Sequence, residues 1–147
     1  MACFLFKNML LYRGNNKDGG IFMSYKKRMT KFKYTLSHKK AFLKIEKELT
    51  GKNTLAGYLH DLDKLILYMF TPIPLKQVHE IHRLTARHHV NDIKKTKEDY
   101  IQMVIDWECA RYTKPDKPLT AYGTMKKYYP ETEFYIHPIL KELKLIA

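Results

Sequence analysis

Six of the seven histidines lie between residues 38 and 89, a crowding that points to shared chemistry. Two stretches are densest, His60-Asp61-Leu62-Asp63-Lys64 and the segment from His79 to His89. Imidazole nitrogens and carboxylate oxygens together suit Mn, Fe, Co, Ni and Zn ions. Burying so many polar rings without a compensating partner is costly. The sequence therefore predicts a site for one or two divalent transition-metal ions.

Spacing limits how these side chains can meet. Neighbouring residues on a helix point about 100° apart, so His60 and Asp61 can bind one ion only where a helix ends or a partner helix crowds the site. On a helix predicted over residues 74–90, His82 and His89 are seven apart and share a face. A single histidine on such a face is more often a hydrogen-bonded core residue. Several histidines in one short region favour a role as metal ligands.

The order of these residues resembles the HD superfamily of metal-dependent phosphohydrolases. In that family a helix-borne His, a His-Asp doublet and a distant Asp hold one metal, and further histidines can hold a second. The resemblance implies a helical HD-like domain and two ligand sets. The first set is His38, His60, Asp61 and Asp106, and the second is His82 with His88 or His89.

Local motifs extend the resemblance, which covers about residues 36–140. The doublet continues as H-D-x-x-K, whose lysine (Lys64) approaches the phosphate in related enzymes. The His88-His89 pair and Asp106-Trp107 are similar to an uncharacterised bacterial and phage branch. The Gly-Tyr-Pro motif of cyclic-dinucleotide hydrolases and the signatures of alarmone hydrolases are missing, so the substrate does not transfer with the fold.

The leading hypothesis is hydrolysis of a nucleotide or another phosphate ester. Asp61 is the candidate to link the metal with the nucleophile. Lys64, with Arg83 or Arg87, is expected to bind the phosphate and neutralise the charge that develops on it. Among the neighbours, Asp63 is expected to face away from the site and Glu108 to be a surface acid. Trp107 is expected to pack in the core, and Cys109 to be a small buried hydrophobe.

Two other functions fit the same residues. Residues 1–40 hold ten Lys/Arg and one acid, whereas the rest of the chain carries only +3 of the net +12. Tyr25, Phe32 and Tyr34 lie among these lysines, a mixture that suits single-stranded nucleic acid. The chain would then be a nucleic-acid or protein-binding module that retains the metal site. The third possibility is a di-iron oxygenase on the same scaffold.

The elements that must position these residues are predicted to be helices, because apolar residues recur at helical spacing and no stretch alternates like a strand. Proline and glycine separate the segments. We expect a compact all-α bundle of about five or six helices. Their predicted ranges are 37–50 with Ser37 as cap, 53–70, 74–90, 97–111 with Thr96 as cap, a short helix after Thr120, and 138–145.

Length and composition complete the prediction. A chain of 147 residues with 45% hydrophobic residues fits one domain, expected over residues 35–147 after a flexible basic arm over residues 1–34. Met23 is an alternative translation start. Two distant cysteines and the lack of a long apolar stretch favour a cytoplasmic protein without membrane contact. The expected partner is a phosphorylated small molecule, with nucleic acid possible through the arm and the oligomeric state left open.

Overall fold

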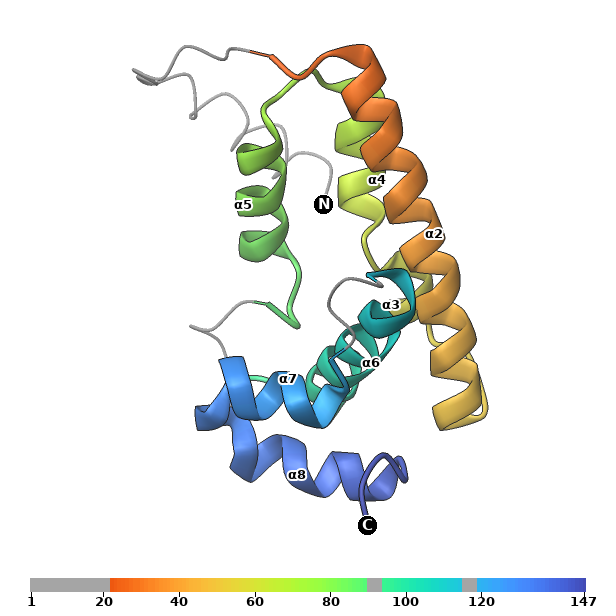
Figure 1. Ribbon diagram of the computed structural model, residues 1–147, viewed down its shortest axis with the longest axis vertical. Coiled ribbons are helices and arrows are strands. Elements are labelled where there is room, and N and C mark those ends of the chain that lie inside the picture. The colour runs from red at the N-terminus through yellow and green to blue at the C-terminus, as the bar shows by residue number, and fades with distance from the viewer. Residues whose placement is uncertain (1–21, 90–93, 115–118) are drawn as a thin grey trace.

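The computed structural model describes residues 22–89, 94–114 and 119–147, and this part of the chain is helical without strands, which confirms the all-α class. Figure 1 shows α4 beside α2, and α7 and α8 at the opposite end of the molecule from the N-terminal half of α2. The helices are α2 (Tyr25–Thr50), α3 (Leu55–Leu59), α4 (Leu62–Phe70), α5 (Leu75–Thr85), α6 (Lys97–Thr113), α7 (Ala121–Tyr128), the 3-10 turn η1 (Pro130–Thr132) and α8 (Glu133–Glu142).

The long helix α2 begins at Tyr25 with Ser24 as cap, so the prediction that Ser37 starts it is wrong. Tertiary contacts explain the earlier start. The backbone N–H of Met23 donates to the carbonyl of Pro72 over 2.7 Å, and Phe32 packs against a small core that includes Val78. The expected boundary between arm and domain at residues 34/35 therefore falls inside a helix. Residues 1–21 lie outside the described part of the chain.

The helix predicted over residues 53–70 is two helices, separated at His60 and Asp61. Asp61 has a φ of 56°, a left-handed backbone that aspartate tolerates better than most residues and that turns the chain between α3 and α4. Carbonyl groups at the end of α3 need partners once the helix stops. The Lys39 ammonium donates to the carbonyls of Tyr58 and His60, the latter at 2.8 Å.

Two other helix bounds differ from the sequence prediction. α5 ends at Thr85, so His88 and His89 lie in the turn that follows rather than on the helix. α8 begins at Glu133 and contains Pro138, which was expected to start it. An internal proline costs a helix about 3 kcal/mol or more. Burial of apolar residues on both sides of it, such as Ile136 and Leu140, offsets that cost.

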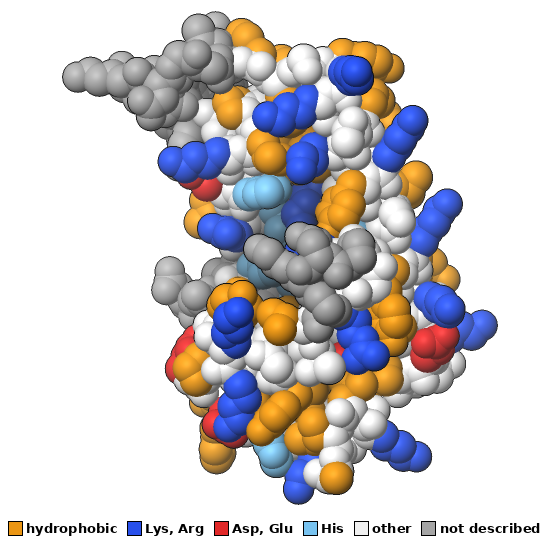
Figure 2. All heavy atoms as spheres, in the orientation of Figure 1, with side chains coloured by type: hydrophobic (Ala, Val, Ile, Leu, Met, Phe, Trp, Pro, Cys, Tyr) orange, Lys and Arg blue, Asp and Glu red, His pale blue; other side chains and the backbone are white. Residues whose placement is uncertain are grey.

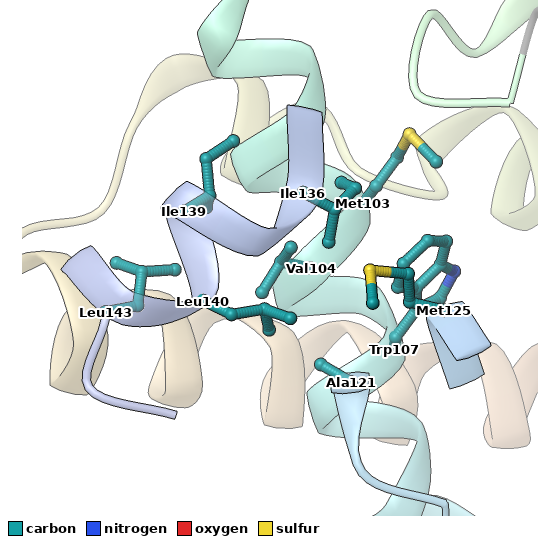
Figure 3. Close-up of a cluster of buried hydrophobic side chains, with 9 residues drawn as sticks. All are labelled: Met103, Val104, Trp107, Ala121, Met125, Ile136, Ile139, Leu140 and Leu143. Atoms are coloured by element: carbon teal, nitrogen blue, oxygen red, sulfur yellow. The ribbon is translucent and has the colours of Figure 1, made fainter. Parts of the chain in front are cut away.

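The main apolar core joins α6, α7 and α8, and Figure 3 shows its side chains interlocking between these helices. Trp107 belongs to it, as predicted, and its ring stacks on Tyr129 with centroids 5.0 Å apart. A second cluster joins α2 to α6 and contains the fully buried Cys109, in line with its expected packing role. Within the described ranges, no helix is long and apolar enough to cross a membrane.

A fully buried carboxylate, that of Glu46, ties three helices together. It accepts hydrogen bonds from the Thr54 backbone N–H and hydroxyl at 3.2 and 2.6 Å, and from the Gln102 amide at 2.9 Å. Gly57 passes so close that an added Cβ would lie 2.0 Å from a Glu46 oxygen. Sequence reasoning did not single out Glu46, because nothing in its spacing distinguishes it from a surface acid.

Glu108 was expected on the surface, and this prediction is wrong. Its carboxylate is buried and accepts a 3.0 Å hydrogen bond from the backbone N–H of Ala121, the first residue of α7. Arg111, one turn further along α6, pairs with it at 2.9 Å. Glu108 therefore fixes the start of α7 on α6, a role that follows from the fold and not from local sequence.

Candidate metal centre

The His60-Asp61 doublet lies at a helix end, one of the two arrangements in which the sequence allowed both side chains to reach one site. His60 caps α3, Asp61 caps α4, and both are buried. The His60 ring stacks on Phe42 of α2 with centroids 3.9 Å apart. The left-handed turn at Asp61 thus allows two adjacent residues to face the same interior.

The other two ligands predicted for the first metal come to this doublet from α2 and α6. His38 Nε2 lies 2.9 Å from Asp106 Oδ1, and His60 Nε2 lies 3.5 Å from the same oxygen. The second ring nitrogen of His38 is within hydrogen-bond distance of the Thr113 hydroxyl at 3.2 Å. The four predicted residues converge although up to 68 positions separate them.

The second histidine group meets the first at Asp61. His82 Nε2 of α5 lies 3.3 Å from Asp61 Oδ1, and His60 Nε2 lies 3.9 Å from that oxygen. One nitrogen each from His82, His88 and His89 lie within 4.8 Å of one another. The turn after α5 places His88 and His89 against His82. Their convergence therefore does not depend on the shared helix face that the sequence predicted.

Asp63 belongs to the site, contrary to the prediction that it faces away. Its oxygens lie 2.9 and 3.1 Å from His82 Nδ1. The prediction assumed a continuous helix through Asp61, whereas α4 starts only at Leu62 and its first turn faces α5. Metal-binding histidines usually donate their other N–H to a carboxylate in this way, which fixes the ring and aims the free nitrogen.

The protonation states suit metal binding. Burial raises the pKa of Asp61, but the neighbouring His60, Lys64 and His82 more than offset this and lower it to about 2. Burial likewise opposes ionisation of Asp106, yet His38 and His60 hold its pKa well below the usual value. Burial lowers the pKa of His88 to about 3. Ionised carboxylates and neutral imidazoles are the forms that bind metal at neutral pH.

The polar atoms of the site fit an ion. Within the described residues, both ring nitrogens of His60 and the Nε2 atoms of His82 and His88 are buried and make no hydrogen bond. An unpaired buried polar group costs about 1–3 kcal/mol, so four such nitrogens in one place need an explanation. Nitrogen and carboxylate donors are the set that divalent transition metals take. A metal ion in this cluster gives such nitrogens a partner.

A cavity of about 530 Å³ opens onto the cluster, and its lining includes Asp61, Asp106, His82, Lys64 and Arg83. Lys64 Nζ lies 2.7 Å from Asp61 Oδ1, so its amine turns into the site and not into solvent. Figure 2 shows histidine side chains gathered in a hollow near the middle of this face, with Lys and Arg side chains around them.

Arg87 does not line this cavity, although the sequence expected it to reach the same phosphate. Its guanidinium pairs with Asp99 at 3.0 and 2.8 Å, and Asp99 also completes the capping box of α6. The reason is the early end of α5 at Thr85, which leaves Arg87 in the following turn. Sequence reasoning also missed the lining residues Lys31, His79 and Lys114. The three- and four-residue spacing of Lys31, Thr35 and His38 is the signal that would have placed Lys31 there.

In comparisons with protein-family models, curated proteins and solved structures, nothing matches this chain. The interpretation of the site therefore rests on its own geometry.

Proposed function

We propose that this chain is a metal-dependent phosphohydrolase that acts on a nucleotide or another phosphate ester, as its resemblance to the HD superfamily implies. One observation carries the proposal. His82 is buried with Nδ1 held by Asp63, while its Nε2, which makes no hydrogen bond, points at Asp61 Oδ1. The Lys64 ammonium contacts the same oxygen. This arrangement joins an oriented metal ligand to a phosphate-binding cation in one cavity.

Two ligand sets are available. Divalent ions, when bound, lower the pKa of a coordinated water toward neutrality and polarise a phosphoryl oxygen. Mn, Fe, Co, Ni and Zn all suit the mixed donors. The first set is His38, His60, Asp61 and Asp106, and the second is His82, His88 and His89.

Side chains around the two ligand sets have the other roles in the proposed reaction. The Asp61 carboxylate lies between the two sets and is ionised, so it can orient a nucleophile beside either. Lys64 supplies positive charge toward the reacting phosphate as a point charge, and Arg83 in the same cavity offers a fork that can bind phosphate oxygens bidentately. The cavity volume falls in the range typical of small-molecule sites, about 300–1,000 Å³. The buried Cys109 thiol takes no part, because burial raises its pKa.

The test begins with metal analysis of the full chain purified without chelator. A phosphatase screen across nucleotides with Mn, Co, Ni and Mg follows. We expect bound transition metal and hydrolysis that both disappear in Asp61→Ala, whereas Glu48→Gln, which alters an exposed carboxylate of α2, retains them. Wild-type protein that carries no transition metal and hydrolyses no ester would exclude the proposal. An absorbance band and oxygen consumption with reduced iron would favour the di-iron oxygenase instead.

Nucleic-acid binding is the second candidate, favoured by the composition of α2. Its exposed side chains include Lys26, Lys27, Lys33 and Lys40 together with Tyr25. A basic face with aromatic residues suits single-stranded backbones. Steeply salt-dependent binding of an oligonucleotide that is unaffected by Asp61→Ala would support it. The phosphohydrolase proposal also includes a cytoplasmic location, for which the free, buried Cys109 is a supporting feature.

A further inference from the structure

The cavity carries a second group of positive side chains beyond the metal cluster. Lys31 of α2 and Arg83 of α5 line it together with Lys64, and the His79 imidazole of α5 lies among them as a hydrogen-bonding group. Lys31 lies seven residues before His38, which places it two turns and about 10 Å along the helix from that ligand. His79 and Arg83 are four residues apart and share one face of α5. Two helices thus direct cations into one part of the cavity.

These cations have no carboxylate set against them. Within the described residues, Lys31 and Arg83 form no ion pair, and the acids that line the cavity are Asp61 and Asp106 of the metal cluster. Burial lowers the pKa of His79, and the charges of Lys64, Arg83 and Lys31 lower it further. Like charges held together in a cavity repel one another and attract an anion.

The side of the cavity around α6 and α7 is mostly aromatic and apolar, although Lys114, which follows α6, also lines it. Trp107 and Ala110 of α6 line it, together with Leu119, Tyr128 and Tyr129 around α7. Tyr129 is partly exposed and lies parallel to Trp107, at an interplanar angle of 11°. Aromatic and apolar walls suit the organic part of a ligand. The cationic part is therefore available for a further anionic group.

We propose that Lys31, His79 and Arg83 form an anion subsite for a second phosphate group, so that the ligand of this cavity carries at least two phosphates. This inference rests on the proposed function for the position of the first phosphate, beside Lys64 and the metal ligands. Arg83 supplies a planar fork and Lys31 a point charge, which are the two usual ways of holding phosphate oxygens.

The test is a calorimetric titration of the full chain with inorganic pyrophosphate and, separately, with inorganic phosphate. The protein is used as purified, and matched titrations into its dialysis buffer subtract the binding of either anion to free metal ions. Wild-type protein should bind pyrophosphate about 10–100-fold more tightly than phosphate, the scale of one or two charge-assisted hydrogen bonds. The double variant Lys31→Ala/Arg83→Ala should lose that advantage.

The chain offers a matched control on the same two helices. Lys33→Ala/Lys76→Ala removes two exposed cations outside the cavity and changes the net charge equally. It should keep pyrophosphate affinity within about threefold, since exposed charges are screened. Circular dichroism checks that both double variants remain folded. Equal losses in the two double variants, or pyrophosphate that binds wild type no better than phosphate, would overturn the inference.

The outcome separates this inference from the proposed function. Loss of pyrophosphate affinity in Lys31→Ala/Arg83→Ala, in a protein that hydrolyses no ester, keeps the subsite and rejects the phosphohydrolase. Metal-dependent hydrolysis by wild-type protein, together with a pyrophosphate affinity that does not change in that variant, keeps the phosphohydrolase and rejects the subsite.

Discussion

Replacing Asp63 tests whether the His82 imidazole is an oriented metal ligand or a hydrogen-bonded core residue. Asp63 contacts His82 Nδ1 through both oxygens, and the unpaired Nε2 faces Asp61 at 3.3 Å. Asp63→Ala removes the acceptor that fixes the ring orientation and the position of its proton. Asp63→Asn keeps an acceptor oxygen but loses the negative charge that makes the ring more basic.

The expected loss of metal affinity follows from the role of Asp63 in orienting the His82 ring. Loss of a carboxylate that orients a ligating histidine typically weakens metal affinity 10–100-fold. That range corresponds to about 1.4–2.7 kcal/mol of binding free energy. Because metal binds the native state, saturating metal should stabilise Asp63→Ala by about that much less than wild type. Asp63→Asn should fall between the two.

The assay measures metal affinity by competition with a chromophoric chelator, and stability by urea unfolding with and without saturating metal. Glu108→Gln is the control, because it alters a buried carboxylate that fixes α7 and does not line the cavity. It should lower stability equally in both conditions and leave metal affinity unchanged. A metal affinity of Asp63→Ala within twofold of wild type would show that His82 is only a core residue.

Three further changes test the site and its support. Lys64→Ala should retain the metal but lower the kcat of phosphate-ester hydrolysis about 10²–10³-fold, the scale of losing one electrostatic stabiliser. Both kcat and metal content are measured, and an unchanged kcat would leave the Lys64 amine with only a structural role. Chelator should lower the melting temperature of wild type but change that of Asp61→Ala little, because only a protein that binds metal loses stability when the metal is removed. Equal shifts of the two melting temperatures in calorimetry would contradict this. Gly57→Ala should cost about 1–3 kcal/mol of unfolding free energy in urea, since the new Cβ would lie 2.0 Å from the buried Glu46 carboxylate. Gly123→Ala should cost less, since its Cβ would lie 3.2 Å from the nearest atom, the Thr120 hydroxyl oxygen.

The order of ligand types predicted which residues meet through its resemblance to the HD superfamily, and helical periodicity explains why they can meet. His38, the doublet and Asp106 lie on separate segments, and apolar positions at helical spacing indicated that these segments are helices. An amphipathic helix buries one face, so ligands on or beside that face were expected to converge. This reasoning depends on residue type and period, which the sequence displays directly.

The errors on Asp63 and Arg87 share a physical cause, because each arose where a helix ends. Asp63 was placed on the wrong side since the helix was assumed to run through Asp61. Arg87 was assigned to the phosphate since α5 was extended past Thr85. Helix ends depend on tertiary partners such as the Asp99 carboxylate, which lies twelve positions beyond Arg87. Local propensity carries little of that information.

Those same helix ends build the candidate site. In an unbroken helix His60 and Asp61 would diverge by about 100°, and one of them would face away from the ion. The left-handed turn at Asp61 brings both inward at a backbone cost of about 1–2 kcal/mol. Lys39, bonded to the carbonyls of Tyr58 and His60, offsets that cost. A strained residue held by its surroundings is typical of functional sites. The break in the helix is therefore better explained by ligand placement than by packing alone, since a continuous helix would satisfy the same carbonyls without a lysine.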